Sequence, residues 1–167
     1  MKKLASRSAQ YPLIAEFAFD FNDWVIDSVD LTKKTLGSTV AAAKDPAEVG
    51  LLGPVANTIV FDCIPLPVGA VVIGGELIVE TAVTGSTAAT ILLGIAGNTA
   101  TLLGSTSLMA AAGTRTPLLL TAALQSAPAG ANVRATIAYT VANATAGRAR
   151  VRLMYTIDGR VSEVQVS

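Results

Sequence analysis

The chain has 167 residues with twelve basic and twelve acidic side chains, so its formal net charge is zero. At about 100–200 residues per domain, this length predicts one domain that can bury a core without disulfides. Hydrophobic residues make up 51% of the chain, which excludes a disordered chain. With no basic surplus, we expect no nucleic-acid partner.

The sequence contains no histidine and a single cysteine. A Ser-His-Asp or Cys-His catalytic arrangement, an internal disulfide and a Cys-rich zinc site are therefore excluded. No paired catalytic acids and no Gly-rich phosphate loop stand out. We expect a protein that is not an enzyme, with no catalytic residue, no cofactor and no metal.

Lys2 and Lys3 resemble the start of a signal peptide, but Arg7 and Glu16 interrupt the apolar stretch of about 7–15 residues that such a peptide needs. The uncharged stretch Thr81–Gly113 is rich in Gly, Thr and Ser, so it lacks about 18 continuous apolar residues. We expect no signal peptide, synthesis in the cytoplasm and no membrane partner.

Strand signals begin in Tyr11–Phe21, where Phe17 and Phe19 alternate with Glu16, Ala18 and Asp20. Gly74 and Gly75 predict a bulge or kink in the long segment Ala70–Val83. Further short, alternating or β-branched segments lie at Thr58–Ile64, Ala89–Ile95, Thr99–Leu103, Pro117–Thr121, Val133–Val141 and Arg148–Ile157.

About eight short strands with no room for crossover helices predict an all-β fold. The fold class is a two-sheet antiparallel β-sandwich, of jelly-roll type. Only Thr39–Val49 and Ser105–Ala112 have the composition for a turn or two of helix. We assign residues 11–167 to one β-sandwich domain and residues 1–10 to an N-terminal arm.

A long excursion over residues 32–57 is expected between the first and second predicted strands. Connections longer than about 12–15 residues are usually functional or disordered, and we interpret this one and the arm as contacts with neighbouring chains. Residues 51–132 carry only four charged side chains: Asp62, Glu76, Glu80 and Arg115. We therefore expect this section to form the interior or to be covered by other subunits.

Asp20, Asp23, Asp27 and Asp30 form the densest cluster of carboxylates. On a helix their spacing places them on one face, but the alternating ligands and glycine of a calcium loop are missing. We interpret the cluster mainly as a solvated acidic edge, with a basic partner or a metal as the alternatives.

Arg148, Arg150 and Arg152 alternate with small apolar residues, which in a strand places three guanidinium groups in a column on one face. Arg134, on the preceding predicted strand, is expected to extend this column across the sheet. Such a row binds carboxylate or phosphate. Because like charges repel, we expect counter-charges nearby; a solvated face, a carboxylate-rich partner and nucleic acid remain open.

Two single residues complete the candidates. Cys63 is in phase with Ile59 and Phe61, which predicts a core thiol rather than a reactive one. Trp24 is the only tryptophan and is expected in the core or at an interface.

Three segments resemble small virion proteins of tailed bacteriophages: Leu66–Thr81 (LPVGAVVIGGELIVET), Gly113–Leu118 (GTRTPL) and Val151–Arg160 (VRLMYTIDGR). The resemblance covers roughly residues 57–165. These relatives include jelly-roll decoration, or cement, proteins, which oligomerise on the outside of the phage head and clamp major capsid subunits together. The resemblance implies no catalytic residues.

Together these observations predict a capsid decoration protein located on the outer surface of the virion. Its expected partners are the major capsid protein and copies of itself, as a dimer or trimer. The alternatives are another virion component, such as a tail or head-fibre base, and a carbohydrate- or ligand-binding β-sandwich with exposed aromatics around Trp24 or Tyr139. Besides residues 1–10 and 32–57, the expected interface residues are Lys2, Lys3, Arg7, Lys33, Lys34, Arg134, Arg148, Arg150 and Arg152.

Overall fold

The computed structural model describes residues 12–29, 31, 33–37, 58–119, 126–127, 131–140 and 143–157. Their strands are β1 (Leu13–Asp20), β2 (Trp24–Ile26), β3 (Lys33–Thr35), β4 (Thr58–Pro65), β5 (Ala70–Thr84), β6 (Ala88–Ile95), β7 (Asn98–Ser107), β8 (Arg115–Pro117), β9 (Ser126–Ala127), β10 (Asn132–Thr140) and β11 (Ala146–Ile157).

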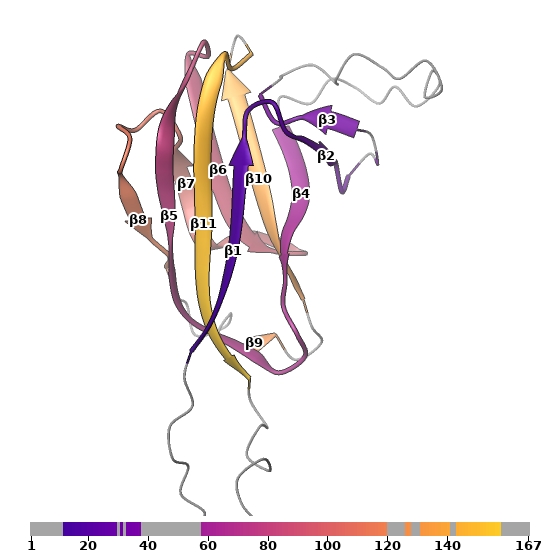
Figure 1. The fold of residues 1–167 in the computed structure, drawn as a ribbon. Helices are drawn as coiled ribbons and strands as arrows, with labels where there is room; N and C mark the ends of the chain where they lie inside the picture. The colour runs from indigo at the N-terminus through magenta and orange to yellow at the C-terminus, as the bar shows by residue number, and fades with distance from the viewer. Residues whose placement is uncertain are drawn as a thin grey trace, which may run out of the picture.

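Two antiparallel sheets pack face to face (Figure 1). One has the order β1-β11-β5-β8, with β9 also paired to β5, and the other has the order β4-β10-β6-β7. The pairs are nested along the chain: β6 with β7, β5 with β8, β4 with β10 and β1 with β11. A long hairpin folded over on itself in this way is a jelly roll, so the predicted all-β sandwich is confirmed.

The core lies between the two sheets and follows from the period-2 pattern of the strands. In β10, Val133, Ala135, Ile137 and Tyr139 are all buried, while the residues between them are half-buried on the other side. Ile59 and Phe61 of β4, Ile91 and Leu93 of β6 and Leu77, Val151 and Leu153 of the facing sheet fill the same interior. Removing this apolar surface from water supplies the main driving force for folding, at roughly 25 cal/mol per Å².

Most strands occupy the predicted segments, with their ends shifted by a few residues. The strand predicted at Pro117–Thr121 is displaced, because β8 covers Arg115–Pro117. Beyond it, the backbone N–H groups of Leu118 and Leu119 donate to the carbonyls of Gly75 and Leu102, which lie in the two different sheets. These bonds tie the end of β8 across the edge of the sandwich.

The helix considered at Ser105–Ala112 is wrong. Ser107 pairs with Thr90 in the β6–β7 ladder, and the N–H of Leu108 donates to the carbonyl of Ala89. The strand ladder therefore satisfies the backbone that a helix would have used. The segment Thr39–Val49 lies outside the described residues. Within the described ranges, the structure contains no helix long and apolar enough to cross a membrane.

The bulge predicted at Gly74 and Gly75 is confirmed. The β5–β11 register shifts there: Met154 lies opposite Gly74, whereas Tyr155 lies opposite Val72. Gly75 has φ of +150°, and a Cβ at this position would collide with the carbonyl oxygen of Arg152. A residue without a Cβ is therefore required where β5 approaches β11 this closely.

Between β1 and β4 the chain forms a short hairpin, β2–β3, beside the edge of β4 (Figure 1). Residues 33–35, at the start of the expected excursion 32–57, are thus a strand paired with β2. Residues 38–57 and the predicted arm 1–10 lie outside the described residues.

Candidate interaction surfaces

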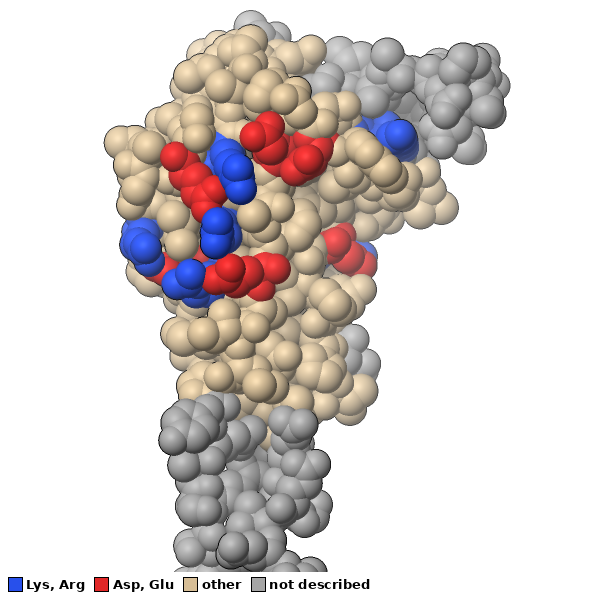
Figure 2. Space-filling model, in the orientation of Figure 1, with Lys and Arg blue, Asp and Glu red and all other residues tan. Residues whose placement is uncertain are grey.

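The predicted arginine column is confirmed on the outer face of the β1-β11-β5-β8 sheet. Arg148, Arg150 and Arg152 of β11 are between 32% and 51% exposed. The intervening Ala149, Val151 and Leu153 are buried. Figure 2 shows this column among charged side chains that gather toward the end of β1 that leads into β2, while much of the remaining face is uncharged.

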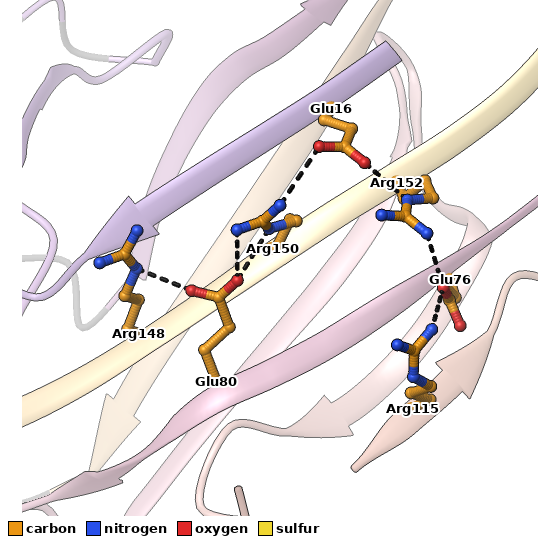
Figure 3. Close-up of polar contacts among 7 residues, drawn as sticks. All are labelled: Glu16, Glu76, Glu80, Arg115, Arg148, Arg150 and Arg152. Carbon is orange, nitrogen blue, oxygen red and sulfur yellow. Dashed lines mark hydrogen bonds and ion pairs between the residues drawn. The ribbon is translucent and has the colours of Figure 1, made fainter. Parts of the chain in front are cut away.

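Glutamates of the two neighbouring strands separate the arginines (Figure 3). Arg148 and Arg150 share Glu80 of β5, with N···O distances of 2.7 and 2.6 Å. Arg150 and Arg152 share Glu16 of β1, at 3.3 and 2.6 Å. The expected counter-charges are therefore supplied by the chain itself.

Glu76 of β5 continues the same series. It lies directly opposite Arg152 in the pairing of β5 with β11, and Glu76 Oε1 is 3.7 Å from Arg152 Nη1. The same carboxylate accepts a hydrogen bond from Arg115 of β8 at 2.7 Å. We call the seven residues the ion-pair ladder: Arg115, Glu76, Arg152, Glu16, Arg150, Glu80 and Arg148. Its four arginines and three glutamates leave a net charge of +1.

The ladder changes the acidity of Glu16. The hydrogen bond from Arg152 lowers the pKa of this carboxyl below its ordinary value of 4.5, and the nearby charges of Arg152 and Arg150 act in the same direction against partial burial. Because all members are accessible to water, solvent screens their attraction and each pair adds little to the stability of the fold. The ladder therefore presents a fixed pattern of alternating charge.

Arg134 does not extend this column, which corrects the prediction. It lies on β10, in the other sheet, opposite Asp62 of β4. Arg134 Nε donates to Asp62 Oδ1 at 2.8 Å, and Asn132 Nδ2 donates to the other carboxylate oxygen. The bond from Arg134 lowers the pKa of Asp62 from its ordinary value of 3.8, although partial burial opposes this effect.

A buried ion pair anchors the β2–β3 hairpin. Lys34 Nζ lies 2.8 Å from Asp27 Oδ2, and the two side chains are 7% and 1% exposed. The same carboxylate accepts from the backbone N–H groups of Val29 and Val60, the latter in β4. Asp27 is therefore not part of a solvated edge, and of the two predicted lysines only Lys33 reaches the surface.

The remaining acidic residues have structural roles or lie outside the described ranges. Asp20 and Asp23 close the turn after β1, where Asp23 accepts from the Asp20 N–H and Asp20 accepts from the Asn22 N–H. Asp30 lies outside the described residues. Among the residues that are described, no group of three or more His, Cys, Asp or Glu is placed to hold a metal ion.

Trp24 is not in the core: it is 58% exposed on β2, and Lys33 Nζ lies 4.1 Å from the centre of its ring. Ile26, Val29 and Leu31 are also exposed nearby in the sequence. Tyr139 is buried, and burial raises its pKa to about 12. The aromatic surface expected for a carbohydrate-binding module is therefore absent at Tyr139.

Cys63 is partly buried against the core, but it does not continue the alternation of buried residues formed by Ile59 and Phe61. The β4–β10 register shifts after Asp62, so that Ile64 is buried in place of Cys63. The Sγ donates to the carbonyl of Val133 at 3.3 Å, and burial raises the thiol pKa to about 12. A thiol with so high a pKa is a poor nucleophile at neutral pH, which agrees with the non-reactive interpretation.

Lys2, Lys3 and Arg7 lie outside the described residues. Among the described residues, the ladder also contains four that the sequence analysis did not single out as interface residues: Arg115, Glu16, Glu76 and Glu80. Glu76 and Glu80 are an even number of residues apart in one strand, so they lie on one face. That spacing was the available signal, but only the sheet order shows that the face is also the arginine face.

Comparison with protein-family models finds no match, and comparison with curated proteins also finds none. Among solved structures, a chain of the cyanophage Pam1 capsid asymmetric unit is similar, with a TM-score of 0.56 and 17% sequence identity. The similarity covers 93% of this chain and 94% of that chain. At this identity the comparison establishes a shared fold over nearly the whole of both chains.

Proposed function

We propose that this chain is a structural, non-enzymatic component of a tailed-phage capsid. The observation that carries the proposal is the full-length similarity in fold to a chain of the cyanophage Pam1 capsid asymmetric unit. The three segments that resemble small phage virion proteins support it independently, because they were identified from the residues alone.

More specifically, we propose that it binds the outside of the major capsid shell as a decoration protein, assembled with copies of itself. The ion-pair ladder supports a role in contact with protein, since alternating charges on a fixed frame favour a partner of complementary pattern and disfavour others. Residues 1–10 and 32–57 remain proposed contact segments. Repetition over a symmetric shell would add avidity to weak single contacts.

The decisive experiment is the copy number of this chain relative to the major capsid protein in purified virions. A ratio near one, or a simple fraction of it, with the chain accessible to antibody on intact heads, is the expected result. A handful of copies per particle would place it at the portal, tail or fibres instead. Absence from the particle would refute the virion assignment.

A second experiment tests the arm. We expect a chain lacking residues 1–10 to keep its β circular-dichroism spectrum, because no described strand includes them, and to occupy fewer sites on heads. Unchanged occupancy would remove the arm from the proposed interface.

A further inference from the structure

The outer edge of β1 offers unpaired backbone groups. β1 is an end strand of its sheet and pairs with β11 without any shift of register from Leu13 to Asp20. In an antiparallel pair, the backbone N–H and C=O groups of successive residues alternate between bonding to the partner strand and pointing away from it. Once the direction of these groups is known for one residue, it is known for every other residue of the strand.

Two residues at the end of β1 establish that direction. The N–H of Phe21 donates to the carbonyl of Gly147, next to β11, whereas Asp20 bonds through both its N–H and its carbonyl to Asp23 in the turn. The backbone N–H and C=O groups of Asp20 thus face away from β11, and so do those of Ile14, Glu16 and Ala18. No described residue bonds to the N–H or C=O of these three.

The facing edge is closed. β4 lies on the other side of the opening, and the carbonyl of its Val60 accepts from the Ser28 N–H at 2.6 Å. The N–H of Val60 donates to the buried carboxylate of Asp27. At this position the β2–β3 hairpin therefore occupies the groups with which β4 would pair with another strand.

A hollow of about 500 Å³ lies beside the open edge. Its apolar lining comes from Phe17 of β1, Phe61 of β4 and, in the hairpin region, Val25, Ile26 and Leu31. Its polar lining consists of Ser28, Asp62 and Arg134. Its volume is within the range of about 300–1,000 Å³ that is usual for ligand sites. A strand added to β1 would direct every second side chain toward Phe17 and this hollow.

The other side chains of an added strand would lie on the outer face of the sheet, and the charges there indicate which residue fits beside Glu16. Across the sheet the ladder reads Arg115 on β8, Glu76 on β5, Arg152 on β11 and Glu16 on β1 (Figure 3). The sign alternates from strand to strand, and a cation on the next strand would continue the series. Cross-strand pairs of opposite charge stabilise a sheet, and like charges destabilise it.

We propose that the edge of β1 binds an extended segment of another polypeptide as an added strand, with a Lys or Arg opposite Glu16 and apolar residues on either side of it. Backbone hydrogen bonds to Ile14, Glu16 and Ala18 hold the segment, and the hollow beside Phe17 selects its apolar side chains. This inference goes beyond the capsid assignment, because it depends only on the strand edge, the hollow and the ladder.

The test uses the full chain and a short fluorescent peptide in which Val and Lys alternate, with binding followed by anisotropy. The matched probe is the same peptide with N-methyl groups on alternate amides, which keeps its charge and apolar content but removes hydrogen-bond donors. We expect saturable binding of the first peptide and at least about tenfold weaker binding of the second. Replacing the Lys residues of the peptide by Glu should also weaken binding. No saturable binding, or equal binding of the methylated peptide, would overturn the proposal.

Variants at Ala18 locate the site. Ala18→Pro removes an outward N–H on an edge strand, where proline is tolerated, whereas the control Ala18→Val keeps it. The proline variant should lose peptide binding at least about tenfold while the valine variant binds normally. Normal binding by a folded proline variant would refute the site, and if that variant does not fold, the methylated peptide decides alone. Sedimentation of the chain by itself tests whether a second copy of the chain occupies this edge instead. A dimer that Ala18→Pro dissociates would assign the edge to a second copy and overturn the proposal of a segment from another polypeptide.

Discussion

Replacing Lys34 by Met should destabilise the β2–β3 hairpin more than the replacement of any surface residue near it. The change keeps an apolar stem of similar length but leaves the carboxylate of Asp27, 1% exposed, without its ammonium partner at 2.8 Å. Removing one partner of a buried ion pair costs about 3–5 kcal/mol, because the remaining charge loses its counter-ion and here, among the described residues, keeps only its hydrogen bonds from the backbone. At about 1.4 kcal/mol per factor of ten, the open population should rise by about two to four orders of magnitude.

Trp24 makes the assay direct, because the only tryptophan of the chain lies on β2. Urea titration followed by its fluorescence reports on the hairpin, and far-ultraviolet circular dichroism reports on the whole sandwich. We expect the fluorescence midpoint of Lys34→Met to fall sharply. If the hairpin opens first, the dichroism midpoint will move less, and if the two fall together, the hairpin and sandwich unfold as one unit.

Two further variants separate the buried charge from other effects. Lys33→Met removes the half-buried neighbour that lies over Trp24 and should cost only about 0.5–1 kcal/mol. Adding Asp27→Asn to Lys34→Met removes the stranded charge and should recover part of the loss. The reasoning fails if Lys34→Met matches Lys33→Met, or if the double variant is no more stable than Lys34→Met alone.

Three other predictions follow from the structure. Gly75→Ala should destabilise the fold by about 1–3 kcal/mol, because its Cβ would collide with the Arg152 carbonyl, whereas Gly104→Ala, with open space at its Cβ, should change the urea midpoint far less. The lowered pKa of Glu16 means that its ion pairs stabilise the protein above about pH 4.5 and are lost as the pH falls through the folded pKa. Glu16→Gln should therefore show a smaller loss of stability below pH 4.5 than the natural chain, and equal acid sensitivity would contradict this. Cys63, with its thiol pKa raised to about 12, should react with a disulfide reagent at pH 8 far more slowly than in urea; immediate labelling of the folded chain would show that the thiol is accessible and ionised.

The strands and the faces of β10 and β11 were predictable from sequence because a period of two is a local property. Wherever an apolar residue alternates with a polar one, the pleat alone sends them to opposite sides, and Ala149, Val151 and Leu153 are buried opposite the arginine column for this reason. The bulge at Gly74 and Gly75 was equally local, since paired glycines inside a strand indicate close approach of another backbone.

Residue spacing could not show which strands become neighbours. Arg134 precedes the arginine column closely in sequence, yet the jelly roll places β10 and β11 in different sheets and pairs Arg134 with Asp62. Cys63 does not occupy the buried position predicted from its spacing to Phe61, because a bulge in β4 changes the register after Asp62. Both outcomes depend on the partner strand, which is far away along the chain.

The sequence by itself determined an all-β chain, the faces of its main strands and the lack of histidine-based chemistry. Tertiary structure alone decided that Glu16, Glu76 and Glu80 stand between the arginines, that Asp27 and Lys34 are buried together and that Trp24 is exposed. The physical reason is that alternation along a strand is set by the backbone of that strand, whereas ion pairing and burial depend on which distant segments the nested hairpins bring into contact.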